Sequence, residues 1–331
     1  MGLKAFAKRG IAVAVAAALA LSLGLAGCSA SASSSSNSFP DTAQDPDKTT
    51  IKIAYLPITH ALPVLEEAKE LSESADSDIQ IELVRYGTWP ELMDALDSGQ
   101  VDGASVLVEL AMRAVEQGID LDAVALGHRD GNVIVARNDI DSIADLKGKT
   151  IAVPARQSSH YILVLQALKR AGLSESDVTI TELAPTEMPS ALASNSIQAY
   201  CVAEPFGAKG VDAGVAHVLE NSEDLWENSI CCAFVLNGNF VKENKKAAKE
   251  LVAAYKKAGK NLSSESEALS VAGEYLNQDQ SVLETSLQWI SFDDLDIDRA
   301  TYKQLVRRVK EAGLSDNPPS YDEFVLDLDK E

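Results

Sequence analysis

The run IKIAYLPITHALPVLEEAKEL, residues 51–71, decides how the chain is expected to fold. Residues 51–55 form a short β-branched run that predicts a strand, and residues 61–71 have the length and apolar spacing of a helix. The alternation continues, and further strands are expected at residues 79–86, 101–106, 123–126, 150–153, 178–183 and 199–203. Strands that alternate with helix-length segments predict an α/β fold with parallel-rich sheets and helices on both faces.

Helices are expected between most of these strands, for example at residues 91–96, 107–117 and 159–171. Capping residues precede several helices: Thr88, Ser158 or Ser159, and Thr186. After Cys232 the pattern changes, because one more strand at 233–236 is followed by a helical C-terminal segment that includes residues 245–262 and 299–312.

This order of segments favours two lobes joined by two crossings, near residues 131–138 and 229–237. We expect residues 49–131 together with 236–331 to form the first lobe and residues 132–235 to form the second. Ligands of open α/β sheets bind beyond the carboxyl ends of the strands. The loops after the strands are therefore where site residues are sought.

Composition excludes several classes of protein. The 331 residues carry 50 acidic and 29 basic side chains, a formal charge of -21, which argues against nucleic acid as a partner. Four cysteines are too few for a small disulfide framework. Apolar residues at 46% and charged residues at 24% are those of a globular chain, and the length allows about two domains of about 100–200 residues each.

The N-terminus has the pattern of an export signal. Lys4, Lys8 and Arg9 precede an uncharged apolar stretch, residues 11–27, which as a helix would span roughly 26 Å, short of the roughly 30 Å hydrocarbon core. The stretch ends in Leu-Ala-Gly before Cys28, which resembles the lipobox of bacterial lipoproteins. That resemblance implies removal of residues 1–27 and a lipid on Cys28; the alternative is an ordinary cleavage site with Cys28 as a bystander.

The expected mature chain begins with a Ser-rich tether, residues 28–48, whose reach is on the order of 25 Å. Removal of the leader deletes three positive charges, so the mature charge becomes -24. A lipid on Cys28 would hold the protein at the extracytoplasmic face of the cell membrane, on the periplasmic side or the cell exterior.

Four segments together carry a family resemblance: YLPITHALP at 55–63, YGTWPEL at 86–92, DLKGKTIAVP at 145–154 and AEPF at 203–206. They resemble the solute-binding lipoproteins of ABC importers in the nitrate, sulfonate and taurine group, which share a fold with thiamine-precursor-binding proteins. The resemblance covers about residues 50–262. It implies a two-lobed, type II periplasmic-binding-protein-like fold that closes on a small solute of the nitrate, sulfonate, taurine or bicarbonate class and delivers it to a membrane permease. It further implies a monomer with no cofactor and no catalysis.

Candidate ligand-binding residues follow the expected strands. Thr59 and His60 open a helix, whose N-terminal N–H groups attract anions, and Trp89 offers an aromatic wall or an indole donor. In the second lobe Ser159 and His160 open another helix. The full set is Thr59, His60, Thr88, Trp89, Ser105, Asn132, Ser158, Ser159, His160 and Glu204, with His128 as a further candidate.

Each candidate also has an ordinary structural interpretation. Thr59 or Ser159 could be a helix cap, Trp89 a core residue, and Glu204 the partner of Lys209 or Arg156. The sequence contains no obvious Arg clamp for a strongly acidic ligand, which leaves a neutral or weakly anionic solute open. The net charge does not exclude an anion, because surface charges are screened beyond about 8 Å at physiological salt.

The cysteines leave further alternatives. Cys201, Cys231 and Cys232 are expected to be small buried side chains, with the adjacent pair on opposite faces if both lie on a strand, although a disulfide with Cys201 is chemically permitted. Thiamine-precursor relatives carry a longer cysteine cluster, which weakens pyrimidine or thiamine-precursor binding as the alternative. A metal-dependent anion site built from His60, His160 and Glu204 is another alternative.

An enzyme on the same fold, with His160 or His60 as a base near Cys201 and Glu204, is the last alternative. The sequence offers no nucleophile elbow, P-loop or dinucleotide fingerprint to support it.

Overall fold

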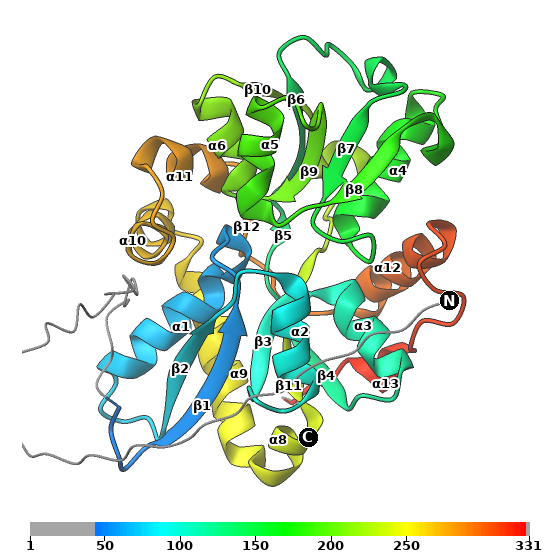
Figure 1. Cartoon of the computed structure of the whole chain (residues 1–331). Helices are drawn as coiled ribbons and strands as arrows, with labels where there is room; N and C mark the ends of the chain where they lie inside the picture. The colour runs from blue at the N-terminus through cyan, green and yellow to red at the C-terminus, as the bar shows by residue number, and fades with distance from the viewer. Residues whose placement is uncertain (1–43, 329–331) are drawn as a thin grey trace, which may run out of the picture. The chain divides into compact units, whose positions relative to one another are not determined.

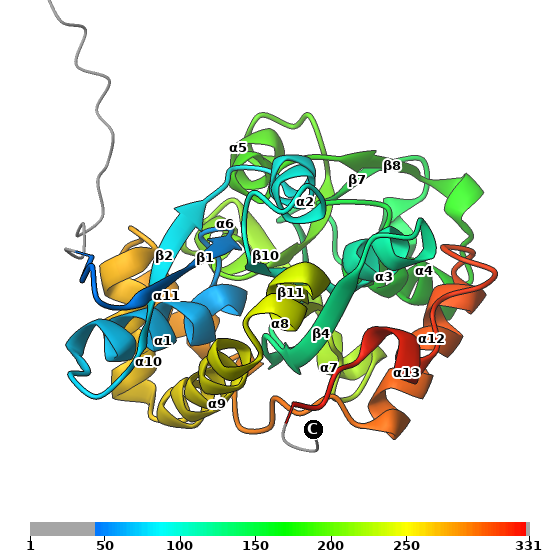
Figure 2. The same cartoon turned by 90° about the horizontal axis from the view of Figure 1, so that it is seen from below.

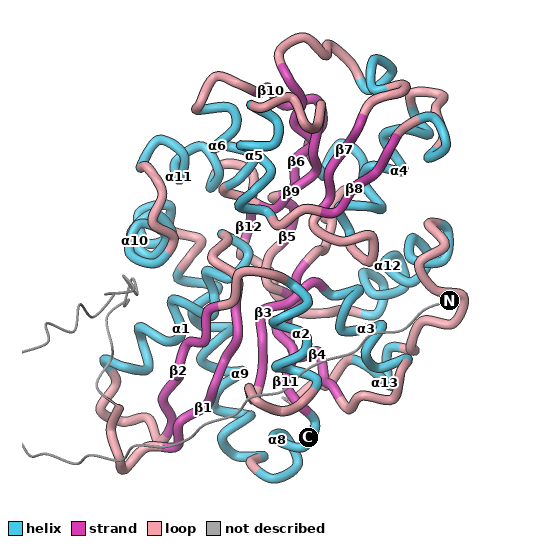
Figure 3. The backbone as a smooth tube through the Cα atoms, in the orientation of Figure 1, coloured by secondary structure: helices cyan, strands magenta, loops and turns pink. Residues whose placement is uncertain are grey.

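The computed structural model describes residues 44–328. The expected leader, the lipidation residue Cys28 and most of the expected tether lie outside the described residues. Within them the strands form two five-stranded sheets and one two-stranded pair, drawn in Figure 1 and, by type of element, in Figure 3. No helix among residues 44–328 is long and apolar enough to cross a membrane.

The first sheet has the strand order β2-β1-β3-β11-β4. Strands β1, β2 and β3 run parallel, whereas β11 is antiparallel to both β3 and β4. The bounds are β1 Thr49–Tyr55, β2 Ile79–Arg85, β3 Gly103–Leu107, β4 Leu121–Leu126 and β11 Cys232–Asn237. All the strands expected in this region are present, and the strand near 233–236 joins this sheet as its antiparallel member.

The second sheet has the strand order β10-β6-β9-β7-β8. Strand β7 is parallel to β8 and β9, while β6 is antiparallel to β9 and β10. The bounds are β6 Asn132–Arg137, β7 Thr150–Val153, β8 Thr179–Glu182, β9 Ala199–Ala203 and β10 Ala216–Asn221. Strands β6 and β10 were not expected from the sequence. Both sheets are therefore mixed, with antiparallel strands where the chain crosses or returns.

Helices cover both faces of the first sheet, as expected. Helices α1 and α9 pack together on one face, and α2 and α3 pack on the other (Figure 2). In α9 the buried side chains, among them Leu251, Val252 and Tyr255, recur every three or four residues, which gives the helix one apolar stripe to bury. The bounds are α1 Leu62–Glu73, α2 Trp89–Asp97, α3 Val108–Glu116, α8 Gly238–Glu243 and α9 Lys245–Asn261.

The second sheet carries α4 Ser159–Arg170, α5 Met188–Ala193, α6 Phe206–Asp212 and α7 Ser222–Leu225. The C-terminal segment is helical, as expected: α10 Glu265–Tyr275, α11 Gln280–Leu287, α12 Arg299–Glu311 and α13 Tyr321–Phe324. Helix α10 packs on α1 and α11 packs on α6, so this segment contacts elements of both sheets. Strand β5, Arg129–Asp130, pairs with β12, Ile290–Ser291, and so connects the first crossing to the C-terminal segment.

Two of the expected caps are present. Thr88 accepts the Glu91 N–H at the start of α2, and Ser158 accepts the Tyr161 N–H at the start of α4. Thr186 lies instead within a 3₁₀ turn, Pro185–Glu187, where Pro185 stands at the first position.

The crossings bring the ends of the two sheets together. Cys232, the first residue of β11, lies opposite Leu107, the last residue of β3. Asn132, the first residue of β6, lies opposite Ala203, the last residue of β9. β6 and β11, the strands that contain the two crossings, therefore both start at the edge where the parallel strands end. The division into lobes at residues 131–132 and 235–236 stays a prediction; β11, which contains the second boundary, pairs within the first sheet.

Candidate functional site

The parallel strands end at the same edge where β6 and β11 start, and we call this the crossing edge. Two histidines and two cysteines meet there. His60 lies in the 3₁₀ turn Thr59–Ala61 after β1, His128 follows β4, and Cys231 and Cys232 stand at the start of β11. One ligand-type atom from each residue lies within 4.8 Å of the others, and all four side chains are fully buried. We call these four residues the His/Cys cluster.

The hydrogen bonds of His60 define its tautomer. Its Nε2 lies 3.0 Å from the Gly131 carbonyl oxygen, which can only accept, so Nε2 carries the proton. Its Nδ1 is the ring nitrogen that faces the Cys232 sulfur, at 3.6 Å. The His128 ring lies tilted against that of His60, with centroids 3.5 Å apart and 35° between the ring planes, and neither nitrogen of His128 has a partner in ordinary hydrogen-bond geometry.

Burial sets the charges in the cluster. It lowers the pKa of His128 to about 4, with a further contribution from His60, so this imidazole is neutral at pH 7. Burial raises the pKa of Cys231. It would also raise the pKa of Cys232, but the close contacts of its sulfur with Cys231, His128 and His60 hold that pKa well below its usual range. The pair therefore favours one thiol and one thiolate.

A second buried group lies at the start of α4. Ser159 Oγ lies 2.8 Å from the Ile230 carbonyl oxygen and 2.5 Å from Glu109 Oε1. The Ser159 hydroxyl donates to Glu109 Oε1, and the Ile230 carbonyl oxygen is a second acceptor within reach of the same hydroxyl. Burial raises the pKa of Glu109 to about 8, against the Ser159 hydrogen bond, which favours the anion, so Glu109 is mostly protonated at pH 7.

His160 joins this group to the cluster. Both of its ring nitrogens lie 3.9 Å from the Cys231 sulfur, and its ring lies 6.5 Å from that of His60, measured between centroids. Burial, with a smaller contribution from His60, lowers the pKa of His160 to about 3. It therefore presents a neutral imidazole.

The second sheet contributes Asn132 and Glu204. Both polar atoms of the Asn132 side chain are buried without a partner. Glu204 Oε2 accepts the Ala208 N–H at 3.0 Å, and Oε1 has no partner. Burial raises the pKa of Glu204 to about 8, against the effect of backbone N–H groups that favour the anion. The Glu204 carbonyl oxygen accepts from both N–H and Oγ1 of Thr59, at 2.9 and 3.0 Å, which joins the two sheets.

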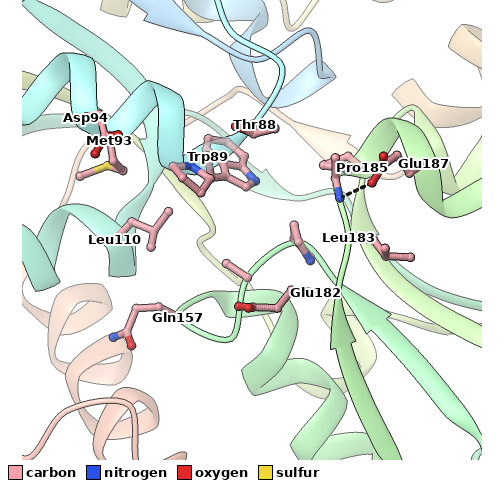
Figure 4. A pocket seen from close by; sticks show the side chains of 14 residues that line it. Thr88, Trp89, Met93, Asp94, Leu110, Gln157, Glu182, Leu183, Pro185 and Glu187 are labelled. Atoms are coloured by element: carbon pink, nitrogen blue, oxygen red, sulfur yellow. Dashed lines mark hydrogen bonds between the residues drawn. The ribbon is translucent and has the colours of Figure 1, made fainter. Parts of the chain in front are cut away.

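A groove of about 540 Å³ lies between α2 and the loops of the second sheet (Figure 4). Thr88, Trp89 and Leu110 line it from the first sheet's side, and Gln157 and Glu182 face them. Trp89 is only 3% exposed and its indole N–H is buried without a partner.

The structure thus gathers many of the predicted residues at the crossing edge. His60, Asn132, Ser159, His160, Glu204 and the backbone of Thr59 lie there, whereas Thr88 and Trp89 line the groove. Ser158 is used as a cap, with its Oγ donating to the Ala155 carbonyl at 2.5 Å. Ser105 is buried in β3 with an unpartnered hydroxyl. Whether these residues contact a solute stays a prediction.

Sequence reasoning missed Glu109 and the role of the cysteine pair. Glu109 is an acidic residue in the first turn of a helix that follows a buried strand, and that placement was a usable signal. Cys231 and Cys232 do not both lie on a strand, because β11 starts at Cys232, and their sulfurs lie 4.0 Å apart. Cys201, Cys231 and Cys232 are all free, so none forms a disulfide.

Glu204 is not ion-paired with either suggested partner, because Lys209 donates to Gln278 and Arg156 pairs with Glu175. The alternative metal set of His60, His160 and Glu204 shares only His60 with the group that the structure brings together.

Comparison with known proteins identifies the family. The model of the NMT1-like family matches residues 44–276. The chain belongs to the NMT1-like family. Among solved structures, this NMT1-like protein is similar to the ligand-binding component of an ABC-type import system from Staphylococcus aureus, solved with zinc bound. The two are 37% identical with a TM-score of 0.83, over 86% of this chain and 99% of that chain.

More distant similarities support the fold. The periplasmic nitrate-binding protein NrtA from Synechocystis PCC 6803 is 17% identical with a TM-score of 0.72, over 85% of each chain. The putative aliphatic sulfonates-binding protein of Escherichia coli K12 is 30% identical over 166 residues, 49% of this chain and 52% of that one. The chain spans about half the length of the curated relatives it matches. The expected family resemblance and the periplasmic-binding-protein-like fold are confirmed.

Proposed function

We propose that this protein is the extracytoplasmic solute-binding receptor of an ABC importer, which captures a small solute by closure of two lobes. The observation that carries the proposal is the set of buried polar atoms without partners at the crossing edge, supplied by both sheets: the side chains of Asn132, Glu204, Glu109 and His128. An unsatisfied buried polar group costs about 1–3 kcal/mol, so a fold tolerates several together where they serve binding.

The solute class follows from the similar proteins and from local chemistry. Relatives named for nitrate and for aliphatic sulfonates favour the nitrate, sulfonate, taurine or bicarbonate class. A protonated Glu109 can donate a hydrogen bond, and the N-terminus of α4 favours negative charge. These groups suit a neutral or weakly anionic solute better than a strongly acidic one.

The membrane attachment is part of the same proposal. Cleavage before Cys28 and its lipidation would anchor a monomeric receptor to the membrane through the tether of residues 28–48, beside its permease. The two lobes would be residues 49–131 with 236–331, and residues 132–235, which hinge at the crossings. Pyrimidine binding remains the alternative solute class, and no catalysis is proposed.

A thermal-shift panel tests the proposal. Nitrate, bicarbonate, sulfonates including taurine, and pyrimidines are added to the purified chain; a solute at 100 times its dissociation constant stabilises the protein by about 2.7 kcal/mol. Trp89→Phe removes the unpartnered indole N–H at the groove and is expected to weaken solute binding at least several-fold. Trp226→Phe is the matched control, because Trp226 is equally buried but does not line this groove.

The proposal fails if no solute of the panel raises the melting temperature and small-angle scattering detects no change in radius on addition of any of them.

A further inference from the structure

We propose that the His/Cys cluster, His60, His128, Cys231 and Cys232, is a tetrahedral binding site for a soft divalent metal ion, with zinc as the best match. The proposal deepens the receptor function and rests on it in one respect only, namely that the ion would lie within the receptor's own site. The metal site itself is argued from the geometry and chemistry of four side chains.

Two of the separations between the donor atoms are close to those of a tetrahedral site. With zinc–sulfur bonds of about 2.3 Å and zinc–nitrogen bonds of about 2.0–2.1 Å, tetrahedral angles place two sulfurs about 3.8 Å apart and a sulfur and a nitrogen about 3.6 Å apart. The Cys231 and Cys232 sulfurs are 4.0 Å apart, and the Cys232 sulfur is 3.6 Å from His60 Nδ1. One ion can therefore reach these three donors with shifts of a few tenths of an ångström, and the His128 donor lies within 4.8 Å of each of them.

The surroundings orient His60 for ligation. Its Nε2–H donates to the Gly131 carbonyl oxygen, so Nδ1 is the nitrogen that faces the cysteine sulfur. Metal-bound histidines commonly donate their other ring N–H to a backbone carbonyl in this way, which fixes the tautomer and the ring orientation.

His128 supplies the independent sign of a ligand. It is fully buried, and neither of its ring nitrogens has a hydrogen-bond partner. The residue before it is Gly127, where an added Cβ would lie 2.9 Å from the His60 carbonyl oxygen and 3.1 Å from the Cys232 Cβ. The absence of a side chain at position 127 is what lets this loop carry His128 against His60 and Cys232.

The donor set selects the class of metal. Two thiolates and two imidazoles in tetrahedral order suit zinc or another soft divalent ion rather than calcium or magnesium, which prefer oxygen ligands. Two thiolates also balance the charge of a divalent cation, which a fully buried site requires. The four ligands come from the end of β1 and from both crossings, so a bound ion would hold these segments together.

The test is metal titration of the full purified chain after removal of metal by a chelator. Zinc chloride is titrated against a chromophoric competitor, and cobalt(II) is used as the spectroscopic probe. We expect one ion per chain, and for cobalt we expect thiolate-to-metal charge transfer together with the intense visible bands of tetrahedral coordination.

Substitutions of the cysteines test whether the His/Cys cluster is where zinc binds. Cys231→Ser with Cys232→Ser is expected to lower zinc affinity at least 100-fold and to abolish the charge-transfer band. Cys201→Ser is the matched control, because Cys201 is also a fully buried free cysteine but lies outside the cluster. If circular dichroism finds the double variant unfolded, His128→Gln replaces it, with the same expected loss of zinc affinity.

The proposal is overturned if the chelated wild-type chain binds no zinc, or if the folded cluster variant binds zinc as tightly as the Cys201→Ser control. The solute panel is read separately on the chelated protein. Solute binding without zinc binding refutes the metal site and leaves the receptor function in place. Zinc binding with no response to any solute refutes the receptor function and leaves the metal site in place.

Discussion

Replacement of Glu204 by Gln should change how the stability of the protein depends on pH. Glu204 is fully buried, one of its oxygens has no partner, and burial raises its pKa from the ordinary value of 4.5 to about 8. In the unfolded chain the same carboxyl titrates near its ordinary value. The folded protein therefore keeps a proton that the unfolded chain releases as pH rises through this window.

The sign follows from proton linkage. A raised carboxyl pKa gives stability that is fully present below the unfolded pKa and is lost as pH rises to the folded pKa. The loss is about 1.4 kcal/mol per pH unit and on the order of 5 kcal/mol across the window from 4.5 to about 8. Gln keeps the shape and an acceptor for the Ala208 N–H but has no proton to lose, so Glu204→Gln should lack this contribution.

Urea unfolding of both proteins at half-unit steps from pH 4 to pH 8.5 measures the effect. The unfolding free energy of the variant minus that of the wild type should rise steadily with pH inside the window and level off above it. Glu73→Gln, on an exposed residue at the end of α1, is the control for a change of surface charge. If the Glu204→Gln and wild-type curves run parallel, Glu204 is ionised in the folded protein and the reasoning is wrong.

Two further predictions concern the packing that supports the site. Gly207→Ala should destabilise the protein by about 1–3 kcal/mol in urea unfolding, because the added Cβ would lie 2.2 Å from a Val133 methyl and 2.3 Å from Glu204 Oε1. Gly273→Ala is its control: it lies within α10 with nothing near its Cβ position, and it should gain about 0.5–1 kcal/mol, so equal effects at the two sites would contradict the argument. Thr59→Val removes the Oγ1 hydrogen bond to the Glu204 carbonyl at 3.0 Å and should cost about 1 kcal/mol; an unchanged urea midpoint would mean that the hydroxyl contributes nothing.

Strands β6 and β10 were not predicted, because local sequence pattern does not reveal them. Residues 132–137 were expected to be a crossing segment, yet they form the interior strand β6, because their pairing partner β9 lies about 70 residues further along the chain. Strand β10 has only one fully buried residue, Ala216, and lies at the edge of its sheet, so it presents a weak apolar signal.

Candidate site residues could be predicted where each residue follows its own strand. Thr59, His60 and Glu204 were found from the rule that ligands lie beyond the carboxyl ends of strands. The His/Cys cluster could not be found in that way, because His60 and Cys232 are 172 positions apart and no short spacing relates them. The same holds for Ser159 and Glu109, which are 50 positions apart and meet through a hydrogen bond.

The sequence by itself determined the alternation of strands and helices, the caps at Thr88 and Ser158, and the candidate residues at strand ends, because these depend on periodicity and on contacts within a few residues. Only the tertiary structure decided that both crossing strands start where the parallel strands end. That arrangement buries His128, Cys231 and Cys232 against His60 and leaves polar atoms of Asn132 and Glu204 without partners. Burial and the meeting of distant segments are properties of the packed chain, and they set the protonation states and donor geometry on which the site depends.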